Sequence, residues 1–326
     1  MKDYNNDASW LTENVWGKWG EDDEVGALND VTPADVVKAA YLIRSGKVYD
    51  LETTRFKGMP VWDGHIGFEL LTYGSPMGRR NMSKNSDYSP AFAWHKDGGW
   101  VASANDDYQI DANTEVMIAP MHMGTHIDGF CHITVGEDAH WYNGYNVSEY
   151  WGDFGPLKTD ATTIPPIILR GVLLDIAGYK GLDHVDPNYG ITPEDIEGCA
   201  AWEGVELRER DCVLLRCGEH WPEMDRCPGA GMTLAAARYL VEEKGAVLLG
   251  DDMIAFEMNH ADGTMSWPRH PHPVHHYCLT QRGVHFMEAV QLDELAKDKT
   301  YEFCFMLASN KIKGATGMFI RPLAIC

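Results

Sequence analysis

Short hydrophobic runs recur along the middle and the end of the chain. They occupy residues 167–175, 212–216, 246–250 and 301–308. These runs are rich in Val, Ile, Leu or Phe, and they are shorter than an average helix. We therefore predict a buried β-strand at each of the four positions.

Segments with helix-start signals lie between these strands. Thr192 and Pro193, followed by Asp195, predict the start of a helix, because threonine caps a helix, proline suits its first turn and the acidic residue completes a capping box. Residues 233–244 predict a second helix, and Thr32 with Pro33 predicts the start of a third. Strands that alternate with helices are typical of an α/β fold.

No internal repeat and no low-complexity linker divides this α/β region. We therefore expect one domain over residues 46–326, preceded by an N-terminal extension over residues 1–45. Residues 47–120 are rich in Gly, Pro, Asn, Asp and aromatic residues, so we expect irregular loops and short strands there. Long ordered loops of this kind often carry function.

The composition is that of an ordinary globular protein, with 44% hydrophobic and 23% charged residues in a chain of 326. The formal net charge of −22 would repel phosphate backbones and anionic membrane surfaces, so neither nucleic acid nor a membrane is an expected partner. No apolar run approaches the roughly 18 residues of a membrane helix. The first residues lack the basic and apolar regions of a signal peptide, so we expect a cytoplasmic protein.

The eight cysteines form no CxxC pair. In a protein without an export signal, this pattern predicts reduced and mostly buried thiols rather than a disulfide framework.

The richest chemistry lies in residues 121–132, where three histidines and one aspartate occur close together. In an extended segment side chains alternate, so His122, His126 and Asp128 would project from one face, and Gly124 would leave room above a bound ion. A helix would turn Asp128 away from His126. We therefore expect an extended segment that binds a divalent metal, with His132 close enough to contribute to the same site.

Three protein ligands with open positions are typical of a catalytic metal site rather than a structural one. The same two histidines and carboxylate are also compatible with a non-haem iron oxygenase. A third possibility is a metal-binding protein without catalytic activity.

The stretch HMGTHIDGFCH resembles the HxGTHxDxxxH signature of the putative cyclase family of metal-dependent hydrolases. This family includes bacterial kynurenine formamidase, isatin hydrolase and trans-dienelactone hydrolase. Further segments resemble family motifs in the same order, and WGEDDEVGALN is similar to the N-terminal signature of the longer branch. The resemblance covers roughly residues 15–326.

The resemblance implies a metal site and two proton-transfer residues. His122, His126 and Asp128 would be metal ligands, and Glu288 would join them. His132 would donate and accept protons. His275 would complete the site with Glu288. In the formamidases these two residues and the aspartate hold a second ion, whereas isatin hydrolase resembles a one-metal version, in which His275 would share the proton transfer. The neighbouring His276 is an alternative to His275, and only one of the two should face the metal, because adjacent side chains point in different directions.

The resemblance also implies the fold, the substrate pocket and the activity. We expect a single α/β domain with a mixed, barrel-like β-sheet core flanked by helices, of the swivelling β/β/α type. Trp62 would line the substrate pocket. A divalent metal, Zn or Mn, would activate water to open a cyclic amide, imide or lactone, or to cleave an aryl formamide or ester. We expect a homodimer or homotetramer that acts on a small-molecule substrate. We expect no organic cofactor.

Two further groups of polar residues lie near these motifs. Asp252 and Glu257 follow the run at 246–250, and we predict that they orient ligands or cap structure rather than react directly. His270, His272, His275 and His276 alternate with prolines, which predicts a rigid loop that presents one of the histidines inward.

Overall fold

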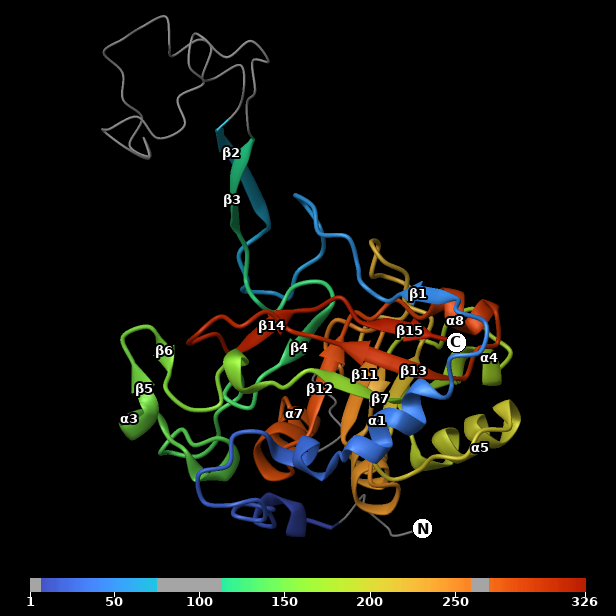
Figure 1. Ribbon diagram of the computed structural model, residues 1–326, viewed down its shortest axis with the longest axis horizontal. Coiled ribbons are helices and arrows are strands. Elements are labelled where there is room, and N and C mark those ends of the chain that lie inside the picture. Colours follow the sequence, from blue (N-terminus) through green and yellow to red (C-terminus); the bar gives the residue numbers. More distant parts are fainter. Residues whose placement is uncertain (1–6, 75–112, 259–269) are drawn as a thin grey trace, which may run out of the picture. The chain divides into compact units, whose positions relative to one another are not determined.

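The computed structural model describes residues 7–74, 113–258 and 270–326 (Figure 1). The chain divides into two compact units. The larger unit comprises Met1–Arg55, Pro60–His65 and Met121–Cys326, and the smaller unit comprises Phe56–Met59 and Ile66–Pro120. The boundary at residue 45 stays a prediction, and most of the long loop region that we expect before residue 120 lies outside the described residues.

A nine-stranded sheet forms the centre of the larger unit. Four neighbouring strands, β7, β9, β11 and β12, run parallel, and the strands on both sides of them pair antiparallel. The sheet is mixed and curled, as the expected fold class requires. Its strands in spatial order are β1 (Val48–Asp50), β15 (Leu323–Ile325), β13 (Glu302–Leu307), β7 (Ile167–Asp175), β9 (Cys212–Arg216), β11 (Leu248–Asp251), β12 (His285–Glu288), β4 (His126–Asp128) and β14 (Gly317–Phe319).

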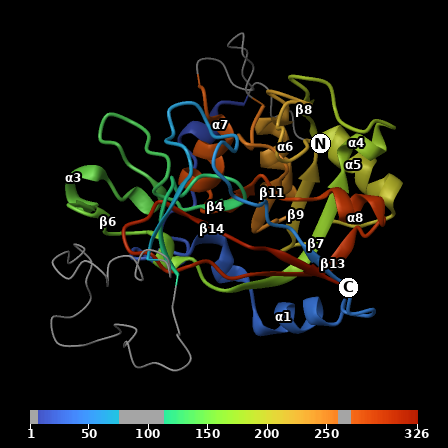
Figure 2. The same cartoon turned by 90° about the horizontal axis from the view of Figure 1, so that it is seen from above.

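Helices cover both faces of this sheet, and Figure 2 shows α1 on one side of the strands and α5 and α6 on the other. The helix starts predicted at Thr32 and Thr192 are confirmed, and both α1 and α5 begin with a capping box, which the sequence analysis predicted only at Thr192. The helices are α1 (Pro33–Ala40), α3 (Val147–Tyr150), α4 (Ile176–Tyr179), α5 (Pro193–Glu203), α6 (Leu234–Arg238), α7 (Pro273–His275) and α8 (Asp293–Lys297).

The helix predicted over residues 233–244 is confirmed at its start and changes character along its length. Thr233 caps α6 by accepting a hydrogen bond from the Ala236 amide at 3.2 Å. After Arg238 the chain continues as a π-helical turn over Tyr239–Glu243. A second π-helical turn, His276–Gln281, continues α7.

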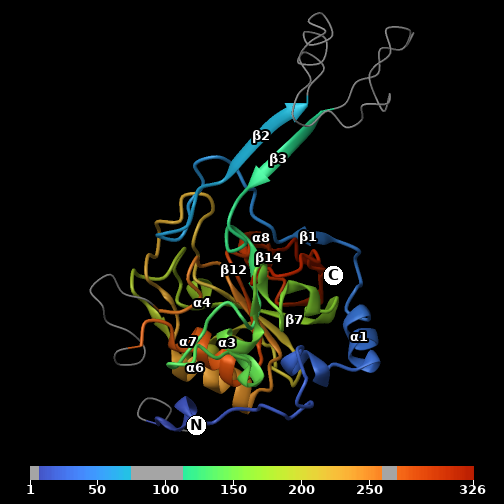
Figure 3. The ribbon, with the colours of Figure 1, turned by 90° about the vertical axis from the view of Figure 1, so that its left-hand side faces the viewer.

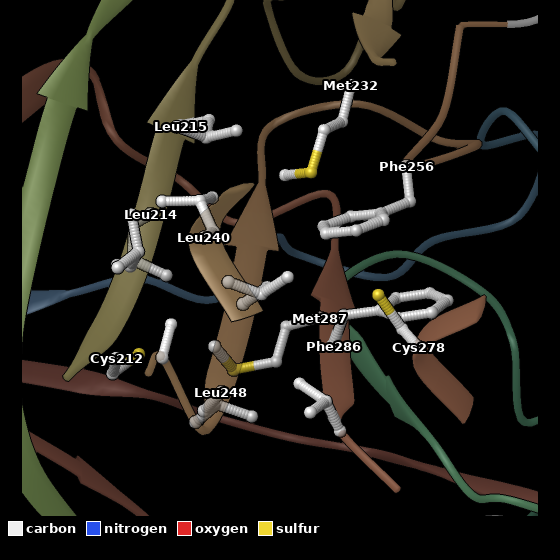
Figure 4. Packing of buried hydrophobic residues seen from close by; sticks show 14 of the residues in the cluster. Cys212, Leu214, Leu215, Met232, Leu240, Leu248, Phe256, Cys278, Phe286 and Met287 are labelled. Atoms are coloured by element: carbon white, nitrogen blue, oxygen red, sulfur yellow. The ribbon is translucent and has the colours of Figure 1, made fainter. Parts of the chain in front are cut away.

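The main core lies between the parallel strands and the helices. Figure 4 shows Leu214 of β9, Leu248 of β11 and Met287 of β12 side by side in this layer. Phe286 of β12 stacks on Phe256 with ring centroids 4.2 Å apart. Because β9 and β11 are buried on both faces, they appear in the sequence as continuous apolar runs. All eight cysteines are free thiols, and seven of them are buried, as expected.

The described residues also form three small two-stranded sheets. Figure 3 shows β2 and β3 as an antiparallel pair in the smaller unit. The pairs are β2 (Glu69–Gly74) with β3 (Thr114–Ile118), β5 (Trp151–Gly152) with β6 (Gly155–Pro156), and β8 (Gly190–Ile191) with β10 (Gly231–Met232).

No helix within the described ranges is long and apolar enough to cross a membrane.

Candidate metal centre

Strand β4 positions two of the predicted ligands. It lies between β12 and β14 and pairs antiparallel with both. His126 and Asp128 are two residues apart, so their side chains project from the same face of the strand. The Nε2 atom of His126 lies 3.4 Å from Oδ1 of Asp128, and both residues are buried.

His122 reaches Asp128 from a bent loop, not from the strand. The prediction of one extended segment from 122 to 128 is wrong for residues 121–125, which form a series of bends. Gly124 has φ +60° there, a left-handed conformation that glycine adopts easily. The convergence of the side chains nevertheless holds, because Nδ1 of His122 lies 2.7 Å from Oδ1 of Asp128. The other ring nitrogen of His122 lies 2.9 Å from the Thr316 hydroxyl.

The second carboxylate oxygen of Asp128 is buried and has no hydrogen-bond partner among the described residues. Two ring nitrogens face it, Nε2 of His275 at 3.7 Å and Nε2 of His132 at 3.8 Å. Glu288 approaches from β12 and places its carboxylate oxygens 3.5 Å from Nε2 of His275 and 3.5 Å from Nε2 of His126. An unsatisfied buried carboxylate oxygen is costly unless a cation or a donor completes it.

The residues form two groups that share Asp128 and suit a metal ion. His122, Asp128 and His132 make one group, and His126, Asp128 and Glu288 make the other. Within each group the ligand atoms lie within 4.8 Å of one another. Imidazole nitrogens with carboxylate oxygens are donors for Zn²⁺ and for other divalent transition metals. The donor set and the unsatisfied oxygen of Asp128 therefore fit a divalent cation.

The two histidines predicted to transfer protons have different surroundings. His132 is partly exposed and stacks on His122 with ring centroids 3.7 Å apart. Burial of its ring lowers the pKa of His132 to about 3. Burial alone also lowers the pKa of His275, but the charge and hydrogen bond of Glu257, with a further contribution from Glu288, raise it well above its ordinary value.

Asp128 stays ionised in this environment. Burial raises its pKa, but the nearby His132 and His122 lower it by more, so that the pKa of Asp128 lies well below its usual range. A charged carboxylate at the centre of the histidines is the form that binds a cation.

The structure distinguishes the two adjacent histidines at 275 and 276. His275 faces Asp128 and Glu288. His276 contacts His270 through Nδ1 at 2.9 Å and Gln281 through Nε2 at 3.0 Å, and its ring packs against Trp10. His276 therefore does not contribute to the group around Asp128.

Trp62 lies close to this region, and its role as a pocket wall stays a prediction. Its ring meets His272 edge-to-face, with centroids 6.2 Å apart. Three residues later, His65 lies 6.4 Å from the ring of His122, and its buried Nδ1 has no hydrogen-bond partner among the described residues. Our sequence analysis did not identify His65, because His65 belongs to none of the motifs and only the folded chain brings it to His122.

Asp252 has the structural role predicted for it. Its two carboxylate oxygens accept hydrogen bonds from the backbone amides of Cys217 and Gly218, each at 2.8 Å, and of Glu219 at 3.1 Å. These bonds hold the loop that follows β9.

Comparisons with known proteins match this chain in sequence and in fold. The family model described as Putative cyclase matches residues 49–258. A crystal structure described as a novel cyclase is 26% identical in sequence, with a TM-score of 0.77 over 97% of this chain and 99% of that chain. Isatin hydrolase A from Labrenzia aggregata is 20% identical, with a TM-score of 0.57 over 88% of this chain and 94% of its own. Isatin hydrolase A from Ralstonia solanacearum is 17% identical, with a TM-score of 0.56 over 90% and 97% of the two chains. No curated protein sequence matches the chain.

Proposed function

The chain belongs to the putative cyclase family, and from this premise we propose that it is a metal-dependent hydrolase. Its substrate would be a small cyclic amide, imide or lactone, or an aryl formamide or ester. The observation that carries the proposal is the buried, unsatisfied Oδ2 atom of Asp128 among histidines and Glu288. Family membership favours hydrolysis over the iron oxygenase and over a metal-binding protein without activity.

His122, His126, Asp128 and Glu288 would hold the cation. When bound, a divalent cation makes a water molecule more acidic and polarises a carbonyl group. Zn and Mn both remain candidates, because histidine and carboxylate donors suit either ion.

His132 is the best-placed residue to move a proton to the leaving nitrogen or oxygen. Its side chain is 23% exposed, whereas that of His275 is 6% exposed, so His132 can meet both substrate and solvent. His275 would hold a proton deeper in the site, facing Asp128 and Glu288. Trp62, beside His272, would form part of the substrate pocket.

The experiment is elemental analysis of the purified protein, followed by a hydrolysis screen with Zn and with Mn. The panel contains cyclic amides, imides, lactones and aryl formamides. His126→Ala should lose both bound metal and turnover, because it removes a ligand from the buried group. His220→Ala, a substitution of a partly exposed histidine that contacts Glu223 and Asp293, is the matched control and should retain both. Full activity in metal-free His126→Ala would rule out the proposal.

We also propose that the protein is a homodimer or homotetramer. Light scattering at micromolar concentration tests this proposal, and a monomer there would contradict it.

A further inference from the structure

Glu257 is a buried carboxylate that lies beside the group around Asp128 and does not belong to it. It is 1% exposed, and its backbone forms a parallel bridge with Met232 of β10. A buried charge persists only where hydrogen bonds or opposite charges compensate it. The partners of Glu257 therefore indicate what it does.

Among the described residues, the hydrogen-bonding partners of its side chain come from one short segment at the start of α7. The Oε1 atom contacts Nδ1 of His275 and, at 3.0 Å, Nδ1 of His272. The Oε2 atom accepts a hydrogen bond from the backbone amide of Val274 at 2.6 Å. One carboxylate thus binds two imidazole rings and the backbone between them.

An ionised carboxylate can only accept hydrogen bonds, so the ring nitrogens that face it must carry protons. Burial raises the pKa of Glu257, but His275 and His272 lower it by more, so the group stays ionised. The Nδ1 atom of His275 therefore carries a proton and donates a hydrogen bond to Glu257. The Nε2 atom faces Asp128 and Glu288.

The opposite edge of the His275 ring faces the residues that would hold the cation. Its Nε2 lies 3.5 Å from Oε1 of Glu288 and 3.7 Å from Oδ2 of Asp128. The ring also meets Phe286 edge-to-face, with centroids 4.7 Å apart. Carboxylate and phenyl ring together leave the imidazole little freedom to rotate.

We propose that Glu257 is a positioning residue that holds the His275 ring, so that Nδ1 donates to Glu257 and Nε2 faces Asp128 and Glu288. This inference rests on the proposed hydrolase function for its catalytic consequence. Carboxylates that orient imidazoles beside a metal commonly change metal affinity or activity by roughly 10-fold to 100-fold when they are removed.

Glu257, His272 and His275 also meet the distance criterion for a metal site of their own. We favour hydrogen bonding, because both carboxylate oxygens of Glu257 already face a donor, Oε1 the two rings and Oε2 the Val274 amide. Oδ2 of Asp128, in contrast, has no hydrogen-bond partner among the described residues.

The test combines NMR of histidines labelled with ¹⁵N and steady-state kinetics of the metal-loaded full chain. The wild type should show a hydrogen-bonded, downfield ring N–H signal from His275, identified by its absence in His275→Asn. Glu257→Gln should lose that signal or shift it upfield, and kcat should fall about 10-fold to 100-fold with a smaller change in KM. His272→Asn, which keeps the bond from Glu257 to His275, is the matched control and should retain the signal, with kcat within about 3-fold.

Three results would overturn the proposal. The first is a wild-type His275 ring without a protected Nδ1–H. The second is a folded Glu257→Gln variant with unchanged kcat. The third is the loss of a second equivalent of metal in that variant, which would instead indicate a metal site at Glu257. The wild-type signal is informative even if Glu257→Gln does not fold. The signal also does not depend on turnover. If the chain binds no metal and hydrolyses no substrate, the proposed function is refuted, and the NMR signal still tests the position of the His275 ring.

Discussion

Asp128 and Asp252 are both buried aspartates near ends of sheet strands, and they are satisfied in different ways. Asp252 receives three backbone amide hydrogen bonds, on both of its carboxylate oxygens. Asp128 has one oxygen near His122 and His126 and a second with no hydrogen-bond partner among the described residues. A carboxylate that accepts hydrogen bonds from backbone amides stabilises a loop. A carboxylate oxygen that lies among ring nitrogens and has no donor is instead suited to bind a cation.

The largest effect expected from this comparison concerns Asp128. Asp128→Asn should abolish metal binding and reduce turnover to background, because the amide has no charge and only one acceptor oxygen. Elemental analysis and the hydrolysis assay measure both quantities. An Asp128→Asn protein that retains stoichiometric metal and activity would show that the centre lies elsewhere.

Asp252→Asn should produce the opposite result, a protein that keeps its metal but is less stable. The single amide oxygen cannot accept all three backbone hydrogen bonds, so at least one buried amide loses its partner, at a cost of about 1–3 kcal/mol. Urea denaturation measures the free energy of unfolding, and elemental analysis measures the metal. Loss of metal with unchanged stability would reverse the roles that we assign to the two aspartates.

A third carboxylate, Glu203, sharpens the comparison because it has neither histidines nor several amides. Its Oε1 accepts a hydrogen bond from the Asp175 amide at 2.7 Å, and its buried Oε2 has no partner among the described residues. Burial raises the pKa of Glu203 from 4.5 to about 8. The folded state therefore holds this proton over a pH range in which the unfolded state has lost it.

The sign of the resulting pH dependence follows by linkage. The contribution of Glu203 to stability is fully present below pH 4.5 and is lost as the pH rises to about 8, because the unfolded chain binds fewer protons in that range. Glu203→Gln should remove this decline. Parallel curves of unfolding free energy against pH for the two proteins would contradict the assignment.

Local signals in the sequence predicted much of the fold. Residues 167–175 are apolar because β7 is a buried inner strand of the sheet, and Thr192 begins α5 through a capping box that depends only on neighbouring residues. The short strands β4, β12 and β14 have no comparable signal. They are three or four residues long, and their pairing depends on contacts between distant parts of the chain.

The candidate site divides in the same way. His122, His126, Asp128 and His132 were identifiable because they share one short motif. The sequence could not decide whether His275 or His276 faces Asp128. That choice depends on which of the two rings Glu257 binds, and the contact joins residues that are 18 positions apart. His65 could not be found from spacing, because only the folded chain brings it to His122.

The position of β4 between β12 and β14 has a consequence for the order of synthesis. Its neighbours in the sheet, His285–Glu288 and Gly317–Phe319, are translated more than 150 residues after Asp128. A chain emerging from the ribosome therefore carries His122, His126 and Asp128 long before it can place them in the sheet. We expect the metal centre to assemble only after residues 285–319 have left the ribosome, so that a product truncated before residue 285 would lack a complete site.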